Sequence, residues 1–168
     1  MTTRRDFLKT MTMASAGLAL GTGDLLGAPI SVSQRKAAAD KVKIAYVGIG
    51  NRGEQIIGDF ARTGMVEVVA LCDVDMGAPH TQKVMNMYPK AKRFRDFRQM
   101  FDKAGNDFDA VAIATPDHSH FPITMLALAS GKHVYVEKPL ARTFYEAELL
   151  MQAALKRPNL VTQVGNQG

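Results

Sequence analysis

A glycine-rich segment at residues 48–53 constrains the fold of this chain more than any other feature of the sequence. It reads G-I-G-N-R-G and directly follows residues 42–47, a short run rich in β-branched side chains that predicts a buried parallel strand. Residues 54–62 follow with apolar side chains at helical spacing. A G-x-G-x-x-G segment between a strand and a helix is typical of a dinucleotide-binding domain, whereas the glycines alone would be a weak signal.

Each glycine of this segment has a separate expected task. Gly48 allows the tight turn, Gly50 lets the backbone approach a pyrophosphate, and Gly53 lets the helix pack against the strand. The N-terminus of the helix offers N–H groups and a partial positive charge to phosphates. We therefore expect Asn51 and Arg52 to join the glycines in binding the cofactor. The alternative is a glycine-rich turn that binds no ligand.

The second predicted strand, residues 66–72, is followed by an acid that bears on the choice of cofactor. Asp73 stands twenty positions after Gly53, where a dinucleotide-binding fold places the carboxylate that bonds the adenosine ribose. A carboxylate there repels a 2′-phosphate, which favours NAD over NADP. Arg52 keeps NADP open, because a basic residue in the loop can lie near a 2′-phosphate. Asp75 is either a second ribose contact or, as we favour, a plain helix-start acid.

The N-terminus has the pattern of an export signal. Residues 3–9 read T-R-R-D-F-L-K, and a weakly apolar stretch at residues 11–20 leads into small residues. These are the parts of a secretory signal, and the apolar stretch is shorter than the ~20 residues of a membrane span. The paired arginines resemble the address read by the twin-arginine export machinery; the alternative is an amphipathic N-terminal helix. We predict a signal and linker over residues 1–39, cleavage after Ala28 or Ala39, and a periplasmic or otherwise exported bacterial protein.

Residues 40–168 predict one domain in which strands and helices alternate. Further strands are expected at residues 108–114, 133–136 and 160–164. Such alternation predicts an α/β fold with a doubly wound parallel sheet, which is a Rossmann fold. Ligands of these sheets bind at the carboxyl ends of the strands, and the residues expected there are Gly48, Asp73, Thr115 and Glu137.

The helices between these strands carry end signals. One helix is expected from Asp96 to about Ala104, and another over residues 122–130 with Gly131 ending it. A third is expected to reach about Lys156 from a capping box formed by Thr143 and Glu146.

Composition excludes several other functions. The net charge of +5 comes without long runs of like charge, and Arg93, Arg95 and Arg98 are interpreted as a polar helix face, so no nucleic-acid partner is expected. Cys72 lies in an apolar run and is interpreted as a buried hydrophobe rather than a nucleophile. His80 is assigned to a helix surface.

Several motifs together resemble one protein family. They are G-I-G-N-R-G, the acid Asp73, A-T-P-D-H-S-H from residue 114, G-K-H-V from residue 131 and E-K-P-L from residue 137. In this order they resemble the Gfo/Idh/MocA oxidoreductases over about residues 42–164. That resemblance implies NAD or NADP as cofactor, a sugar, inositol or related polyol as substrate, and a C-terminal α/β domain for substrate and oligomer contacts.

The resemblance also implies roles for particular residues. Lys138 is expected beside the nicotinamide, where an ammonium can orient a substrate hydroxyl and polarise the carbonyl. Glu137 is expected to hold Lys138 or tune its pKa, and the Lys138–Pro139 bond is a candidate for the cis form. The resemblance places Thr115, Pro116 and His120 around the dinucleotide, and we expect His120 to hold that loop by hydrogen bonds rather than to perform chemistry. His118 and His120 could together bind a metal, but no third ligand cluster appears, so none is expected.

The chain departs from the family pattern near its end. Residues 165–168 read G-N-Q-G where many members carry a G-F-N-x-R-like segment, which makes Asn166 and Gln167 candidates for binding sugar hydroxyls. The acid and histidine that many members take from the C-terminal half would lie beyond Gly168. We therefore expect a fragment that lacks the substrate domain, and a homo-oligomer for the full-length protein.

Three functions follow from these observations. The first is an exported NAD(P)-dependent dehydrogenase of a sugar or polyol. The second is a glycoside hydrolase of the same fold that holds NAD and acts by transient oxidation and elimination; the intact E-K-P motif favours the dehydrogenase. The third is a dinucleotide-binding module without catalysis.

Overall fold

Strand β1 (Val42–Val47) shows why this sequence forms a sheet that is buried on both sides. Ile44 and Tyr46 pack into one apolar cluster, whereas Ala45 and Val47 pack into another. Because successive side chains of a strand point to opposite faces, the two clusters lie on opposite faces of the sheet. The computed structural model describes residues 41–166; the predicted signal and Gln167 lie outside the described residues.

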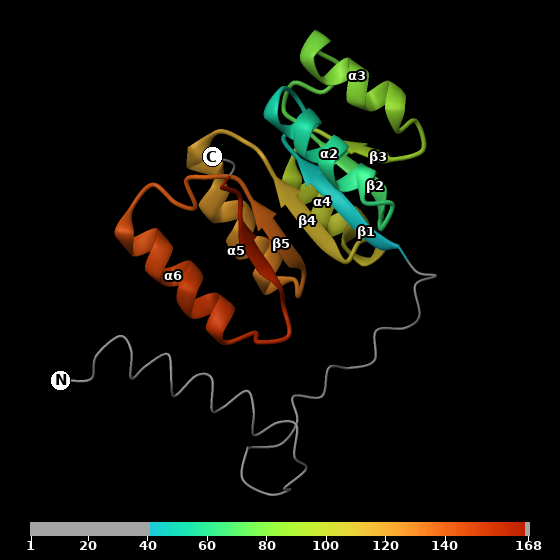
Figure 1. Ribbon diagram of the computed structural model, residues 1–168. Coiled ribbons are helices and arrows are strands. Elements are labelled where there is room, and N and C mark those ends of the chain that lie inside the picture. The colour runs from blue at the N-terminus through green and yellow to red at the C-terminus, as the bar shows by residue number, and fades with distance from the viewer. Residues whose placement is uncertain (1–40, 167–168) are drawn as a thin grey trace, which may run out of the picture. The chain divides into compact units, whose positions relative to one another are not determined.

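The sheet has six strands in the order β3-β2-β1-β4-β5-β6, and every neighbouring pair is parallel (Figure 1). Its remaining strands are β2 (Val66–Cys72), β3 (Lys92–Phe94), β4 (Ala110–Ile113), β5 (His133–Val136) and β6 (Thr162–Val164). This order is that of the doubly wound Rossmann fold, so the predicted fold class is confirmed. The chain reverses its winding between β1 and β4, and this switch point opens a crevice at the carboxyl ends of the two strands.

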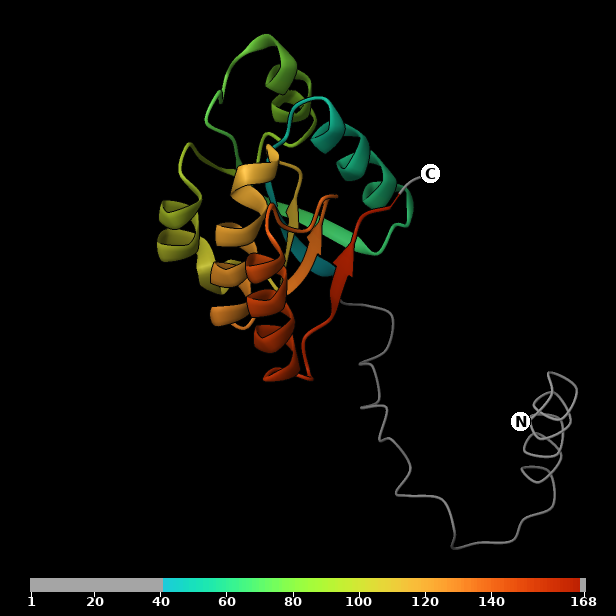
Figure 2. The same cartoon turned by 90° about the vertical axis from the view of Figure 1, so that its left-hand side faces the viewer.

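Five helices connect the strands: α2 (Arg52–Arg62), α3 (Pro79–Met87), α4 (Phe97–Ala104), α5 (His120–Ala129) and α6 (Phe144–Leu155). Short 3-10 turns stand at η1 (Gly105–Asp107) and η2 (Asp117–Ser119). Apolar residues of α2 and α3 join the cluster on one face, and those of α4, α5 and α6 join the cluster on the other. The helices accordingly cover both faces of the sheet (Figure 2). No helix within residues 41–166 is both long and apolar enough to cross a membrane.

Most of the predicted helix ends are confirmed. The Asp96 side chain accepts a hydrogen bond from Arg98 N at 2.8 Å and caps α4. Gly131 has a φ of +71° and ends α5, where the N–H of Lys132 reaches back to Ala127 O at 2.9 Å. The Thr143 side chain accepts from Glu146 N at 3.1 Å.

Other features of the elements differ from the prediction. The Glu146 carboxylate accepts from Arg142 N, at 2.9 Å, so the predicted capping box closes one residue earlier than the motif implies. Helix α5 begins at His120, two residues before the predicted start, because Pro122 fits within a first helical turn. Strand β3 was not predicted: its three residues, K-R-F, are too few and too polar to show a strand period. Arg93 therefore lies on an edge strand instead of a helix face.

Candidate functional site

The glycine-rich turn after β1 has the shape that the motif predicts. Gly48 has a φ of +82°, and a Cβ there would lie 2.5 Å from Ala114 O at the end of β4. A Cβ on Gly53 would overlap the Gly48 carbonyl oxygen. The first glycine thus permits the turn and the close approach to β4, and the third permits α2 to start directly above the turn.

The N-terminus of α2 faces a cleft. Gly50, Asn51 and Arg52 line this cleft, and the Asn51 side chain does not cap the helix. Uncapped first-turn N–H groups and the helix dipole make such an end suitable for phosphates. The ring of His80, from α3, lies against Gly50, where a Cβ would contact its Cδ2 atom. His80 is half-exposed, as assigned from the sequence, but it also borders the place expected for the pyrophosphate.

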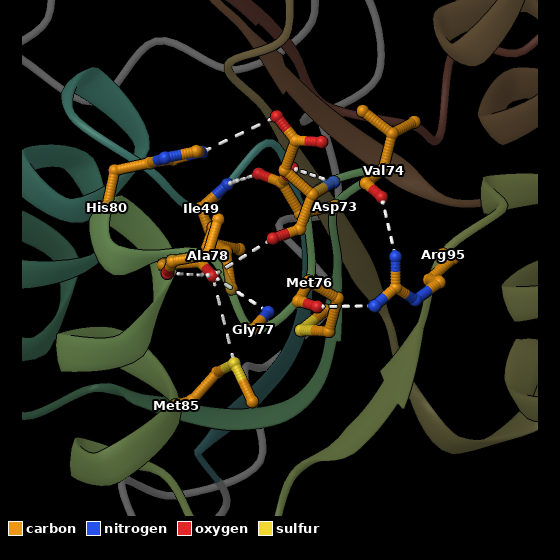
Figure 3. A network of polar contacts seen from close by, with 11 residues as sticks. Ile49, Asp73, Val74, Met76, Gly77, Ala78, His80, Met85 and Arg95 are labelled. Atoms are coloured by element: carbon orange, nitrogen blue, oxygen red, sulfur yellow. Dashed lines mark hydrogen bonds and ion pairs between the residues drawn. The ribbon is translucent and has the colours of Figure 1, made fainter.

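Asp73 binds the glycine-rich turn through its carboxylate (Figure 3). Its Oδ2 atom accepts from Ile49 N at 2.9 Å, and its Oδ1 atom accepts from Asp75 N at 3.0 Å. The predicted ribose ligand is therefore held by two backbone N–H groups, one from each of the loops that follow β1 and β2. A carboxylate oxygen has further lone pairs, so both atoms can still accept hydroxyl hydrogen bonds.

The cleft has a volume of about 620 Å³ and runs along the carboxyl ends of β1, β2 and β4. Among the predicted cofactor residues, it is lined by Gly48, Gly50, Asn51, Arg52, Asp73, Thr115 and Pro116. Its size falls within the range of ligand pockets, and the glycine turn, helix end and acid stand in the order of a dinucleotide's pyrophosphate and ribose. The residues present fit a nicotinamide dinucleotide.

The end of the cleft beside Asp73, where the adenosine is expected, is here called the adenosine end. It contains residues that were not predicted from the sequence. Val74, Phe97 and Arg98 line it, and the Arg98 guanidinium lies 5.0 Å from the centre of the Phe97 ring. Arg95 donates to the carbonyls of Val74, at 3.2 Å, and Met76, at 2.7 Å (Figure 3). Val74 follows β2, whereas Arg95, Phe97 and Arg98 come after β3, so only a prediction of β3 would have brought these three to the site.

Asp96 and Cys72, both near this end, have shifted pKa values. Hydrogen bonds from the Arg98 side chain and backbone lower the pKa of Asp96. Burial, followed by the charges of Asp73 and Asp96, raises the pKa of the Cys72 thiol to about 12. Cys72 is buried, and a thiol with that pKa is not a nucleophile at neutral pH.

His120 connects the loops that follow β4 and β5. It is 1% exposed, and its ring nitrogens lie 2.6 Å (Nδ1) from Pro139 O and 2.8 Å (Nε2) from Thr115 O. Carbonyl oxygens only accept, so both bonds form at once only when both nitrogens carry hydrogen. His120 thus holds the Thr115 turn to the Lys138–Pro139 segment, and Thr115 borders the cleft.

Glu137 is a second buried polar group at this edge, with a side chain 7% exposed. Its Oε1 atom accepts from Tyr135 OH at 2.9 Å and lies 3.3 Å from the Arg52 guanidinium. Arg52 also donates to Gln55 Oε1 at 2.8 Å. The Arg52 side chain therefore extends toward β5, on the side of β1 that faces away from β2 and Asp73.

The remaining predicted site residues lie beyond the cleft lining. The Lys138–Pro139 peptide bond is cis, and Lys138 is exposed directly after Glu137. Asn166 is exposed two residues after β6. Within residues 41–166, no group of three or more His, Cys, Asp or Glu side chains could hold a metal ion.

Comparison with known proteins identifies relatives for this fold and site. The family described as "Oxidoreductase family, NAD-binding Rossmann fold" matches residues 42–165. A glycosyl hydrolase family 109 protein of Shewanella pealeana is 31% identical over 90% of this chain and 36% of its own. An alpha-N-acetylgalactosaminidase of Shewanella oneidensis is 29% identical over the same shares. This chain thus spans about a third of the length of the curated relatives it matches.

Solved structures give the same fold. The scyllo-inositol dehydrogenase of Lactobacillus casei with bound NAD(H) and scyllo-inositol is 29% identical with a TM-score of 0.65, over 75% of this chain and 36% of that one. The WlbA dehydrogenase of Bordetella pertussis, in complex with NADH and UDP-GlcNAcA, is 25% identical with a TM-score of 0.64, over 74% and 37%.

Proposed function

This chain belongs to the Gfo/Idh/MocA oxidoreductase family, and from that premise we propose that the whole protein is an NAD(P)-dependent dehydrogenase of a sugar, inositol or related polyol. One observation carries the proposal. The cleft that fits a dinucleotide and the Lys138–Pro139 segment lie at the same edge of the sheet and are held together by His120. The dehydrogenases with scyllo-inositol or a UDP-sugar bound support the substrate class.

Each residue of the site has a role in this reaction. The glycine turn and the first turn of α2 bind the pyrophosphate, and Asp73 binds the adenosine ribose. A nicotinamide held by these residues would supply hydride transfer to or from the carbinol carbon of the substrate. The Lys138 ammonium orients the substrate hydroxyl and stabilises charge that develops on its oxygen. Asn166 and Gln167 supply amide groups for further hydroxyls.

NAD is the favoured cofactor in this proposal. Three carboxylates, those of Asp73, Asp75 and Asp96, line the adenosine end of the cleft and would repel a 2′-phosphate. The two arginines there, Arg95 and Arg98, already bond backbone carbonyls and Asp96.

Export and assembly complete the proposal. The T-R-R-D-F-L-K segment supports export through the twin-arginine route, which carries folded proteins and therefore suits an enzyme loaded with cofactor in the cytoplasm. The C-terminal part of the longer relatives is where we expect the substrate domain and the contacts of a homo-oligomer.

A glycoside hydrolase that retains NAD is the second candidate. The glycosyl hydrolase family 109 relatives, and the alpha-N-acetylgalactosaminidase among them, favour it. In that case the same site would oxidise a sugar carbon transiently, eliminate the aglycone and reduce the carbon again, with no net consumption of NAD.

The deciding experiment starts from the full-length exported protein, purified natively. Denaturation followed by assay of the released small molecules should yield stoichiometric NAD. A panel of sugars and inositols is then tested for absorbance of NADH, and aryl α-N-acetylgalactosaminide for release of the aryl alcohol. Net NADH formation identifies the dehydrogenase, and aryl release without net NADH identifies the hydrolase. A protein that neither holds nor binds NAD or NADP would refute both.

A further inference from the structure

The pair formed by Arg52 and Glu137 joins two loops that are distant in both the sequence and the sheet. Arg52 is the first residue of α2 and lies within the glycine-rich segment that follows β1, and Glu137 directly follows β5. Strand β4 lies between β1 and β5, so the contact spans a whole strand of the sheet. The residue after Glu137 is Lys138, the proposed catalytic residue.

Burial gives this contact its importance. The Glu137 side chain is 7% exposed, and the Arg52 side chain is 36% exposed. Removing the cationic partner of a buried carboxylate is strongly destabilising, whereas an exposed ion pair contributes little. The Tyr135 hydroxyl, at 2.9 Å, adds a second donor to the same Oε1 atom. Glu137 therefore fixes the end of β5 relative to Arg52.

The chain after β6 packs closely on the same group. A Cβ on Gly165 would lie 2.6 Å from both Glu137 Oε1 and Tyr135 OH. Gly165 also donates its N–H to Val136 O at 2.7 Å. The segment that carries Asn166 is thus positioned against the carboxylate that Arg52 holds.

Arg52 has donors for a phosphate as well. A guanidinium carries five N–H donors, more than its contacts with Gln55 and Glu137 use. Arg52 also lines the cleft beside Gly50 and Asn51, at the helix end that suits phosphates. One side chain can therefore contact a bound pyrophosphate and Glu137 at the same time.

We propose that Arg52 is a positioning residue that couples occupation of the phosphate loop to the placement of the Lys138 segment through Glu137, and that it is not a ligand of a 2′-phosphate. The coupling rests on the proposed function, in which Lys138 acts beside the nicotinamide. Through this coupling, the bound dinucleotide orders the Lys138 segment before a substrate arrives.

The test uses ADP, which has the pyrophosphate but lacks the nicotinamide and its ribose. Hydrogen exchange is followed by mass spectrometry in peptides covering residues 48–57 and 137–142 of the intact protein, with and without saturating ADP. In the unaltered protein, ADP should slow exchange in both segments by at least about fivefold, the lower end of ordinary coupling energies. In Arg52→Gln, ADP should still protect residues 48–57 but should no longer protect residues 137–142.

Three further variants separate coupling from general damage. Arg52→Lys, which keeps the charge, should restore part of the remote protection, and Glu137→Gln should abolish it while leaving Arg52 in place. Arg62→Gln is the matched control, because Arg62 ends the same helix and pairs with the exposed Asp59. It should behave as the unaltered protein. If Arg52→Gln fails to fold, Glu137→Gln provides the test alone.

Binding of NADH and NADPH, measured by the fluorescence of the dinucleotide, tests the second part of the proposal. Arg52→Gln should weaken both by the same factor, since Arg52 extends away from the 2′ position. Protection of residues 137–142 that persists in both Arg52→Gln and Glu137→Gln, or a selective loss of NADPH binding, would overturn the inference. An unaltered protein that binds neither ADP nor NADH would instead refute the proposed function.

Discussion

The two halves of the sheet's carboxyl edge are built by different means. At β1 and β2 the edge depends on missing side chains: Gly48 and Gly53 leave room for backbone atoms that a Cβ would overlap. At β4 and β5 it depends on buried polar side chains, His120 and Glu137, that join separate loops. The first half should therefore fail when atoms are added, and the second when atoms are removed.

The largest effect is expected from adding one carbon to the first half. Gly53→Ala places a Cβ on the Gly48 carbonyl, which cannot move without breaking the turn, and should cost about 3 kcal/mol or more of unfolding free energy. Gly58→Ala is the matched control in the same helix, because a Cβ there meets nothing within 4 Å. It should stabilise the protein by up to about 1 kcal/mol. Urea unfolding measures both, and equal stabilities for the two variants would contradict this account of the turn.

Removing the His120 ring is expected to be next in size. His120→Leu keeps an apolar side chain but leaves the Thr115 and Pro139 carbonyls without these hydrogen bonds, which should cost about 2–4 kcal/mol. His118→Leu changes an exposed neighbour and should alter stability by less than about 0.5 kcal/mol. Thermal unfolding compares them. A His120→Leu protein as stable as the control would show that the two loops do not need this connection.

A smaller effect, on affinity, is expected at Asp73. Asp73→Asn weakens the bonds to Ile49 N and to the ribose and removes the charge that repels a 2′-phosphate. The preference for NADH over NADPH should fall by about tenfold, or ~1.4 kcal/mol. Asp75→Asn removes an equal charge from a side chain that is 67% exposed and should change the preference less than threefold or so. Fluorescence titration with each dinucleotide measures the ratio of the two affinities. An unchanged ratio in Asp73→Asn would show that this acid does not select the cofactor.

The smallest effect concerns Cys72, at the end of β2. Because burial raises the pKa of its thiol to about 12, the folded protein should react with a disulfide reagent very slowly at pH 8, and the rate should still be rising above pH 9. The urea-unfolded protein, whose thiol ionises near pH 8.5, should react rapidly at pH 8. A fast reaction of the folded protein would show that β2 opens readily at the cleft.

The first half of the edge could be predicted almost completely from the sequence. Its motif is contiguous, and the strands at residues 42–47 and 66–72 have the predicted bounds. The contact between Asp73 and Ile49 N was not predicted, because the motif states only what the acid does for a ribose. Strand β3 was missed with its cleft-lining neighbours, since a three-residue strand with two charged side chains is too short to show an apolar period.

The second half was harder to predict, because its side chains form hydrogen bonds with groups that are distant in the sequence and share no motif with them. Glu137 was assigned to Lys138, its neighbour in the chain, whereas the structure also brings it to Arg52, 85 residues away. His120 was expected to hold its own loop, and it does so at Thr115, but its bond to Pro139 depends on β5 lying beside β4. Pairings of this kind follow from the strand order and not from any local pattern.

The double attachment of Asp73 has a consequence for how this protein could change its cofactor preference over evolutionary time. Replacing the acid is the shortest genetic route to accepting a 2′-phosphate, yet the same carboxylate also holds the glycine turn and the turn after β2. A protein that replaced Asp73 would lose the hydrogen bonds that hold these two loops, together with its selectivity at the ribose. Substitutions at Val74 or Asp75, which line the cleft without holding the glycine turn, offer a less disruptive path. A directed-evolution library should therefore begin with these two positions and leave Asp73 unchanged.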